Sequence, residues 1–495
     1  MPEHGMHAWA QPITVVYVPG YLDPMLERAL SELLEWFRAN GSLVQSQPTN
    51  ETDLILTTAR FGQPLGRDEA LLISGKRKYG LSRRPQVLTV VSLREKEYDE
   101  HIAHFTELAA HPEISHQYTG LGPQAVEVLV EQAQRGGPEV ALGRLMQAQM
   151  ISIRVMALIG EEAGQPLRAI HFDLAGAHPT TDAANLQAFA DETGRRILTA
   201  VCAHDVDHHS EEAEPLSRAV WESLTTPEAM IQAGVTFTRY GFFTTPIAIE
   251  KILGYKGGIG EAIAAQYSEG CYAVYEPEIP GLITTATGSS RLVDKRSITR
   301  DDQGIVVGVK PERDGAKVMQ VEGRPRTLPS VEAVEMMGIC EALPPHPSKN
   351  RKGEPVSVPP VHAILHGHLG VQSYDPKCIE TVFLDGLYYD YLVSCGTGAL
   401  ASGTAQAFMR SATLRDFADP RGVVFLEQPG HGVVIIEKWV EGKDPFETIH
   451  EYLETGRLKM TMQVPQGRVY WGRETAEYGR VLMQKAPGPA EAVAV

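Results

Sequence analysis

The stretch ITVVYVPGYLDPMLERALSELLEWFRANG, residues 13–41, shows the fold class of the N-terminal part of the chain. Its β-branched run at 13–18 predicts a buried strand that ends at Pro19 and Gly20. Asp23 is then placed to cap a helix that starts at Pro24 and ends before Gly41. Apolar residues recur between these two positions at helical spacing, so one face of the helix must be buried.

The same alternation of strands and helices continues along the first 200 residues. We expect strands at 53–57 and 86–92 with a helix at 68–79 between them, and mainly helix from 97 to 159. A second strand–helix–strand unit is expected over 168–174, 182–192 and 196–203. Such alternation favours a parallel sheet with helices on its faces.

Strands become more frequent toward the C-terminus. A Pro-rich, charged stretch at 343–355 is interpreted as a linker or a long surface loop. The fold class expected is α/β, with two Rossmann-like α/β domains and a strand-rich α+β C-terminal domain. The ranges expected for these parts are 1–165, 166–345 and 346–485, with a disordered tail at 486–495.

Composition narrows the classes of function. The 495 residues carry 45 Lys and Arg against 62 Asp and Glu, a formal net charge of −17 that argues against a general binder of nucleic acid or of anionic membranes. The 5 cysteines include no C-x-x-C pair, which excludes a zinc ribbon. No apolar run approaches the roughly 18 residues of a membrane span, and the start does not resemble a signal peptide. We expect a cytoplasmic protein with a small-molecule substrate.

The first candidate cluster is HDVDHH, residues 204–209, which follows the strand expected at 196–203. Ligands bind outside the carboxyl ends of strands in open α/β sheets. Imidazole and carboxylate together suit Mn²⁺, Fe²⁺ or Zn²⁺, so His204 and Asp207 are candidate metal ligands. The alternative is a polar, solvated loop that caps the next helix.

The second candidate is the pair Glu276 and Glu278, which flank Pro277 between two apolar runs. Paired carboxylates in unequal environments can divide acid and base roles or hold a divalent ion. The alternative is a proline-containing turn with two exposed glutamates.

Histidines form a third group. His366 and His368 end an expected strand, and an i, i+2 pair on an extended segment points both rings to one side, where they can hold a metal or position an acid and a base. His431 lies between two glycines that join two expected strands, where it is a ligand or an exposed turn residue.

A fourth group suits an anionic or polyhydroxylated ligand. Arg291 and Lys295 lie near small hydroxyl residues and can form charge-assisted hydrogen bonds. Gly396 and Gly398 lie between an expected strand and a helix, whose N-terminal amides favour an anion. The alternatives are a surface loop with ion pairs and an ordinary helix entry.

Two segments resemble the L-fucose/L-arabinose isomerase superfamily. They are EGCYAVYEPEIPGLIT at 269–284 and GHGVV at 430–434. The resemblance implies a homo-oligomer that catalyses Mn²⁺-dependent aldose–ketose isomerisation. It also implies that Glu276 or Glu278 binds the divalent ion together with His431.

The sequence therefore predicts a metal-dependent enzyme that acts on a sugar or another polyhydroxylated small molecule, most readily an isomerase. Its predicted catalytic residues are Glu276, Glu278, His366 and His368. An alternative is a metal-independent protein that binds an organic anion or a phosphosugar. A third is a structural subunit whose histidines are polar surface. Whether the two histidine groups share a pocket stays open.

Overall fold

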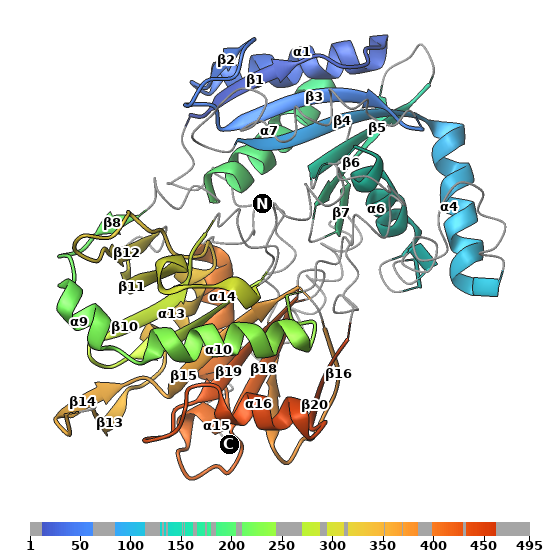
Figure 1. Cartoon of the computed structure of the whole chain (residues 1–495). Helices are drawn as coiled ribbons and strands as arrows, with labels where there is room; N and C mark the ends of the chain where they lie inside the picture. Colours follow the sequence, from blue (N-terminus) through green and yellow to red (C-terminus); the bar gives the residue numbers. More distant parts are fainter. Residues whose placement is uncertain are drawn as a thin grey trace, which may run out of the picture.

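In the computed structural model, the chain forms two large β-sheets, each covered by helices, and two short two-stranded sheets (Figure 1). The mixed α/β class expected from the sequence is confirmed. The structure describes residues 12–62, 85–113, 129–130, 133–134, 137–150, 152, 154–161, 166–173, 176–179, 185–203, 210–243, 270–287, 295–310, 315–350, 352–368, 370–384, 398–428 and 432–461.

The first sheet has seven strands: β1 to β5 run parallel, and β6 pairs antiparallel with both β5 and β7. Most of its central residues are buried, which explains the near-continuous apolar runs in their sequences. In sheet order the strands are β2 (Leu43–Gln45), β1 (Thr14–Val18), β3 (Leu54–Arg60), β4 (Gln86–Arg94), β5 (Arg154–Gly160), β6 (Pro166–Asp173) and β7 (Gly176–Pro179).

Helices cover both faces of this sheet. On one face α1 (Pro24–Ala39) and α7 (Leu186–Ala203) pack into a common core, and on the other α4 (Glu95–Ala110) and α6 (Pro138–Met150) do so. The predicted cap is confirmed, because the Asp23 side chain accepts a hydrogen bond from the amide of Leu26 at 2.8 Å.

The second sheet has nine strands and is mainly antiparallel. Its centre is formed by strands from two distant parts of the sequence. In sheet order they are β17 (Ile379–Val382), β18 (Val423–Gln428), β19 (Gly432–Lys438), β15 (Val361–Gly367), β9 (Cys271–Glu276), β10 (Gly281–Thr285), β11 (Gln303–Val309), β12 (Ala316–Met319) and β8 (Glu211–Glu212).

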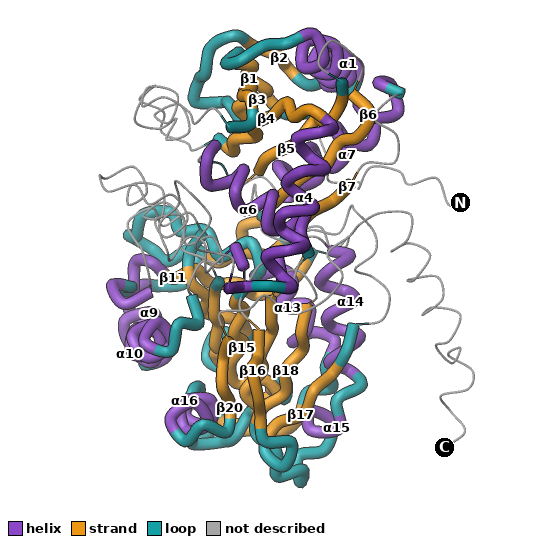
Figure 2. The backbone as a smooth tube through the Cα atoms, turned by 90° about the vertical axis from the view of Figure 1, so that its right-hand side faces the viewer, coloured by secondary structure: helices purple, strands orange, loops and turns teal. Residues whose placement is uncertain are grey.

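This sheet too lies between two layers of helices, as Figure 2 shows from the side. One layer holds α9 (Arg218–Ser223), α10 (Thr226–Arg239) and α16 (Glu447–Glu454). The opposite layer holds α13 (Ala333–Ala342), α14 (Gly398–Met409) and α15 (Ala412–Arg415). Two 3₁₀ turns, η2 (Lys295–Ser297) and η3 (Arg300–Asp302), lead into β11.

Two antiparallel pairs lie outside the large sheets. One is β13 (His346–Lys349) with β14 (Pro355–Val358), so the expected linker at 343–355 is largely a hairpin. The other is β16 (Gly370–Tyr374) with β20 (Leu458–Thr461). Among the described residues, no helix combines the length and the apolar character that crossing a bilayer requires.

Two expectations about secondary structure are wrong. The helix expected up to 159 ends at Met150, and the strand β5 follows it. The strand expected at 196–203 is the second half of α7, whose residues Phe189, Ile197 and Val201 pack with α1. Short apolar runs fit either a buried strand or a buried helix, which is why periodicity did not separate them. The helix expected at 68–79 lies outside the described residues.

Strand pairing runs across both boundaries that the sequence suggested. The strands β6 and β7, from the range 166–345, belong to the first sheet, and β15, from the range 346–485, pairs with β9. The predicted division into folding units is not tested by this pairing and stays a prediction, and the tail at 486–495 lies outside the described residues.

One buried acid stabilises the start of α16. Glu437 in β19 is 1% exposed, and its two oxygens accept hydrogen bonds from the amides of Thr448 and Ile449 at 2.8 and 3.0 Å. Burial nevertheless raises the pKa of Glu437 to about 8, because desolvation of the charged form outweighs these amides.

Replacing Glu437 with Gln should flatten the pH dependence of stability. The ordinary pKa of the carboxyl, 4.5, is lower than its folded value of about 8, so Glu437 contributes stability that is fully present below the first value and is lost as pH rises through the second. The slope approaches about 1.4 kcal/mol per pH unit. Urea unfolding between about pH 5 and about pH 8 measures it.

The control is E441Q, which removes an exposed acid. Its free energy of unfolding should change with pH as steeply as that of the wild type. Because Gln accepts at only one of its two terminal atoms, E437Q also loses about 1–2 kcal/mol at every pH. If the free energy of unfolding changes equally with pH in wild type and E437Q, the raised pKa of Glu437 is contradicted.

Candidate functional site

Side-chain alternation along β9 and β15 determines which residues meet. Cys271 is opposite His366 at one end of this antiparallel ladder, and Ala273 is opposite Ile364. Opposite residues point to the same face, and Ala273 and Ile364 both belong to the core formed with α13 and α14. Cys271 and His366 therefore lie on the α13–α14 face, where β15 ends.

The same face and end of the sheet carry a buried pair of glutamates. Glu335, in the first turn of α13, is 1% exposed and accepts hydrogen bonds on Oε1 from the Thr404 hydroxyl and the Gln428 amide, both at 2.6 Å. Its second oxygen, Oε2, is buried and has no hydrogen-bond donor among the described residues. Glu332, which precedes α13 and is 5% exposed, lies against it.

This environment favours the protonated form of Glu335. Burial, and next the charge of Glu332, raise the pKa of Glu335 well above its ordinary value, although Thr404 and Gln428 act in the opposite direction. Two buried carboxylates in contact do not both ionise at neutral pH, because their mutual repulsion is not screened by water. The pair therefore retains a proton.

A thiol lies close to this pair, and a buried lysine lies near that thiol. Lys295 is 3% exposed, and burial lowers its pKa to about 8. Burial also raises the pKa of the Cys271 thiol, on which the charges of Glu332 and Lys295 both act. Cys271 is therefore a neutral thiol, while Lys295 supplies a cation whose proton is weakly held.

His366 and His368 complete the group that we call the sheet-end cluster: Cys271, Lys295, Glu332, Glu335, His366 and His368. The two imidazole rings lie with their centroids 5.2 Å apart, and they are 1% and 8% exposed. This agrees with the prediction that both rings lie on one side. The strands β15 and β19 approach closely here, since a Cβ at Gly432 would lie 2.0 Å from the carbonyl oxygen of Gly367.

The structure does not bring Glu276 to this cluster. Glu276 is five residues beyond Cys271 along β9, or about 17 Å, and the alternation places it on the opposite face, against α10. There it accepts hydrogen bonds from the Thr226 hydroxyl at 2.6 Å and from the amide of Glu278 at 3.1 Å. Glu276 thus stabilises the N-terminus of α10, where a carboxylate is favoured.

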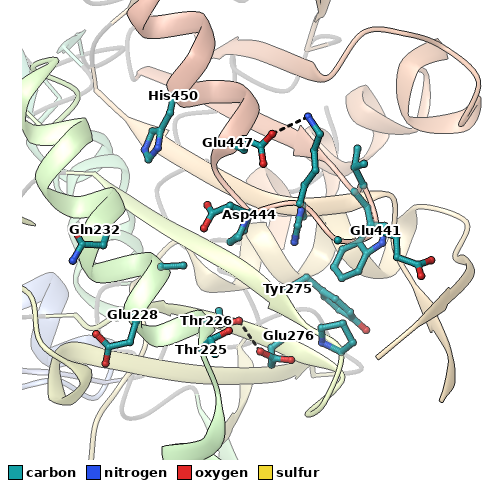
Figure 3. A pocket seen from close by; sticks show the side chains of 18 of the residues that line it. Thr225, Thr226, Glu228, Gln232, Tyr275, Glu276, Glu441, Asp444, Glu447 and His450 are labelled. Carbon is teal, nitrogen blue, oxygen red and sulfur yellow. Dashed lines mark hydrogen bonds and ion pairs between the residues drawn. The ribbon is translucent and has the colours of Figure 1, made fainter. Parts of the chain in front are cut away.

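Glu276 lies on the floor of an open groove, shown in Figure 3. The groove has a volume of about 1150 Å³ and lies between the start of α10, the end of β9 and the start of α16. Several of its acids already have partners: Glu228 pairs with Arg300 at 2.8 Å and Glu447 with Lys443 at 3.2 Å. Much of the acidic charge in the groove is therefore neutralised locally.

The remaining predicted site residues are placed as follows. Glu278 is 14% exposed at its side chain, with Lys352 at 3.9 Å, and Gly398 is the first residue of α14. The structure does not describe His204, Asp207, Arg291, Gly396 or His431. The strand predicted to precede His204 and Asp207 is wrong, because these residues follow the helix α7.

The described part of the chain contains no group of three or more His, Cys, Asp or Glu that could hold a metal ion. Glu276 and His366 do not fit one metal site, because they lie on opposite faces of the sheet. The predicted Mn²⁺ site therefore has no complete ligand set among the residues that the structure describes.

The buried charge of Lys438 has a structural explanation. The ammonium group of Lys438 donates to the carbonyl oxygens of Asp416, Phe417 and Asp419 at 2.9, 3.3 and 2.9 Å, which occupies its three donors. Glu335 differs, because its Oε2 has no donor among the described residues and a second buried acid, Glu332, acts on its carboxyl. The sheet-end cluster is therefore the candidate for proton transfer.

Sequence reasoning missed Glu332 and Glu335. The signal was a carboxylate inside an apolar helical run, VEAVEMMGIC at 331–340, where an acid is costly unless it has a partner. Thr404 and Gln428 were missed as well, because they lie 69 and 93 residues from Glu335.

The fold and the site together define an α/β protein with a buried group of acids and bases at one end of its second sheet. No family model, curated protein or solved structure matches the chain.

Replacing Thr404 with Val should destabilise the fold by about 1–2 kcal/mol, because Val is nearly isosteric but does not donate to Glu335 Oε1. Urea unfolding measures the loss. The matched control is T106V in α4, whose exposed hydroxyl donates to the carbonyl of Ile102, and it should change stability by less than about 0.5 kcal/mol. A T404V protein as stable as wild type would show that this hydrogen bond contributes nothing.

Proposed function

We propose that this chain is an acid–base enzyme that acts on a sugar or another polyhydroxylated small molecule, with aldose–ketose isomerisation as its reaction. One observation carries the proposal. In the sheet-end cluster the carboxyl pair and Lys295 both act on the buried Cys271 thiol, His366 lies opposite Cys271, and the His368 ring lies beside the His366 ring.

These residues supply the functions that isomerisation requires. A proton must leave the carbon beside a carbonyl and return to the carbonyl carbon, so one site needs a base and an acid in a dry environment. Imidazoles and carboxyls of perturbed pKa are the usual groups for this task. Lys295 would bind and polarise an oxygen of the substrate.

We place the acid–base chemistry at the sheet-end cluster, which contains His366 and His368, in preference to Glu276 and Glu278. Glu276 is hydrogen-bonded to Thr226 and lies on the other face of the sheet. Arg291, Gly396 and Gly398 stay proposed substrate-binding residues together with Lys295.

The metal is a separate proposal. The resemblance to the isomerase superfamily supports Mn²⁺, and His204, Asp207 and His431 are the proposed ligands besides Glu276 or Glu278. No step above uses the ion. Metal analysis of protein purified without chelators, together with the thermal shift on adding Mn²⁺, tests this part by itself.

The proposal also covers the cellular location, the oligomeric state and the partners of the enzyme. We propose a cytoplasmic homo-oligomer with no nucleic-acid partner, which the net charge of −17 supports. In the first sheet the order β2-β1-β3-β4-β5 is typical of doubly wound folds and supports the Rossmann-like assignment of that part.

The test of the function is turnover of a panel of aldoses and ketoses, with and without Mn²⁺. H366A and H368A should each lower kcat/KM by about 100-fold, the usual effect of losing an acid or base. The control is H111A, which removes an imidazole that is 62% exposed next to Glu113. No turnover of any panel member, or variants as active as wild type, would overturn the proposal.

The alternative is a metal-independent protein that binds an organic anion or a phosphosugar, which the buried Lys295 favours. A rise in melting temperature with sugar phosphates that persists in EDTA and is lost in K295M, without turnover, would support this alternative.

A further inference from the structure

The carboxyl pair has an arrangement that a purely structural role does not explain. Both donors to Glu335, from Thr404 and Gln428, bind Oε1. Oε2 of Glu335 and Oε2 of Glu332 are both buried and have no donor among the described residues. Two such acceptors in contact repel each other unless a proton lies between them.

The two donors also determine which oxygen carries the proton. An oxygen that already accepts two hydrogen bonds at 2.6 Å has its lone pairs occupied, so a proton on Glu335 belongs on Oε2. Glu332, whose carboxyl acts on that of Glu335, lies before the first turn of α13.

The surroundings of the pair are those of a reactive site. The charges of Glu332 and Lys295 both act on the Cys271 thiol, and His366 lies opposite Cys271 on the adjacent strand. The strand β18 contributes the neutral side chain of Gln428, and α14 contributes the Thr404 hydroxyl. Among the described residues, the titratable groups around Cys271 are therefore the carboxyl pair, Lys295 and His366.

We propose that Glu332 and Glu335 share a single proton, and that Glu332 touches the substrate and moves its proton while Glu335 positions Glu332. This inference rests on the proposed function. It assigns the central role to two residues that neither the sequence patterns nor the resemblance pointed to.

The proposed step is balanced. The Glu332 carboxylate takes the proton from the carbon beside the carbonyl, so that a C–H bond breaks and an enediolate forms. The same carboxyl then gives the proton to the former carbonyl carbon, while the hydroxyl proton passes between the two oxygens. One carbon is oxidised and its neighbour reduced, so no external oxidant or reductant is needed. Glu335 keeps its own proton throughout and acts as a positioning residue.

The experiment compares wild type, E332Q, E335Q and the control E437Q on the full chain, with two readouts. The first does not need activity: infrared difference spectra at neutral pH measure the carbonyl stretch of protonated carboxylic acids. The variant E335Q keeps an oxygen for Thr404 and Gln428 and a donor toward Glu332, so it should fold. We expect E335Q to lose one carbonyl band of a protonated acid, and we expect E332Q to shift the same band. E437Q should lose a different band.

The second readout is isomerisation in D₂O, with the pH profile of kcat/KM and deuterium incorporation at the substrate carbon. E332Q should lower kcat by about 100-fold or more and abolish incorporation. E335Q should shift the acidic limb of the pH profile with a smaller loss in kcat, and E437Q should behave as wild type.

The outcomes separate the two proposals. If E335Q leaves the infrared spectrum unchanged, the shared proton does not exist and the inference is overturned, whatever the activity. If wild type isomerises sugars and E332Q retains kcat within about threefold, the function stands and the role of Glu332 is overturned. If the signal is present but no panel sugar reacts, the proposed function fails, and with it the catalytic part of this inference.

Discussion

The pairing of β9 with β15 is the constraint on which the candidate site depends. Because side chains alternate between the two faces, the register that sets Cys271 opposite His366 fixes the environment of every other residue on both strands. It directs His366 toward α13 and α14 and Glu276 toward α10. A shift by one residue would exchange these faces, expose the apolar side chains to the wrong helices and separate the polar groups of the cluster.

Burial of acids is the second constraint, and the second sheet meets it in two ways. The cost of burying Glu437 is reduced by hydrogen bonds from two amides at the start of α16. These amides can donate to the carboxyl group whether or not it is charged. Glu335 is compensated on one oxygen only, by Thr404 and Gln428, and its other oxygen depends on Glu332. When neutral groups donate to one oxygen of a buried acid and the other oxygen has only another acid beside it, the acid is stable only while it carries a proton. Such acids are typical of sites where protons are exchanged.

Much of the fold could be predicted from local chemistry. The β-branched runs gave β1, β3 and β4, and Asp23 with Pro24 and Gly41 gave both ends of α1. The errors at β5 and in the second half of α7 have one cause, which is that both segments are apolar and buried. When tertiary packing covers a segment on all sides, the periodicity that distinguishes helix from strand disappears.

The candidate site could be predicted only in part, and for a geometric reason. His366 and His368 were identified because their relation is local, two residues apart on one strand. The position of Glu276 relative to these histidines depends on the register between β9 and β15. That register cannot be read from the composition of either strand. Glu335 raises the same difficulty more strongly, since its partners Thr404 and Gln428 lie on other elements and the helix around it is apolar. The informative feature was a charge that the local sequence had no means to stabilise, because such a residue requires partners from elsewhere in the fold.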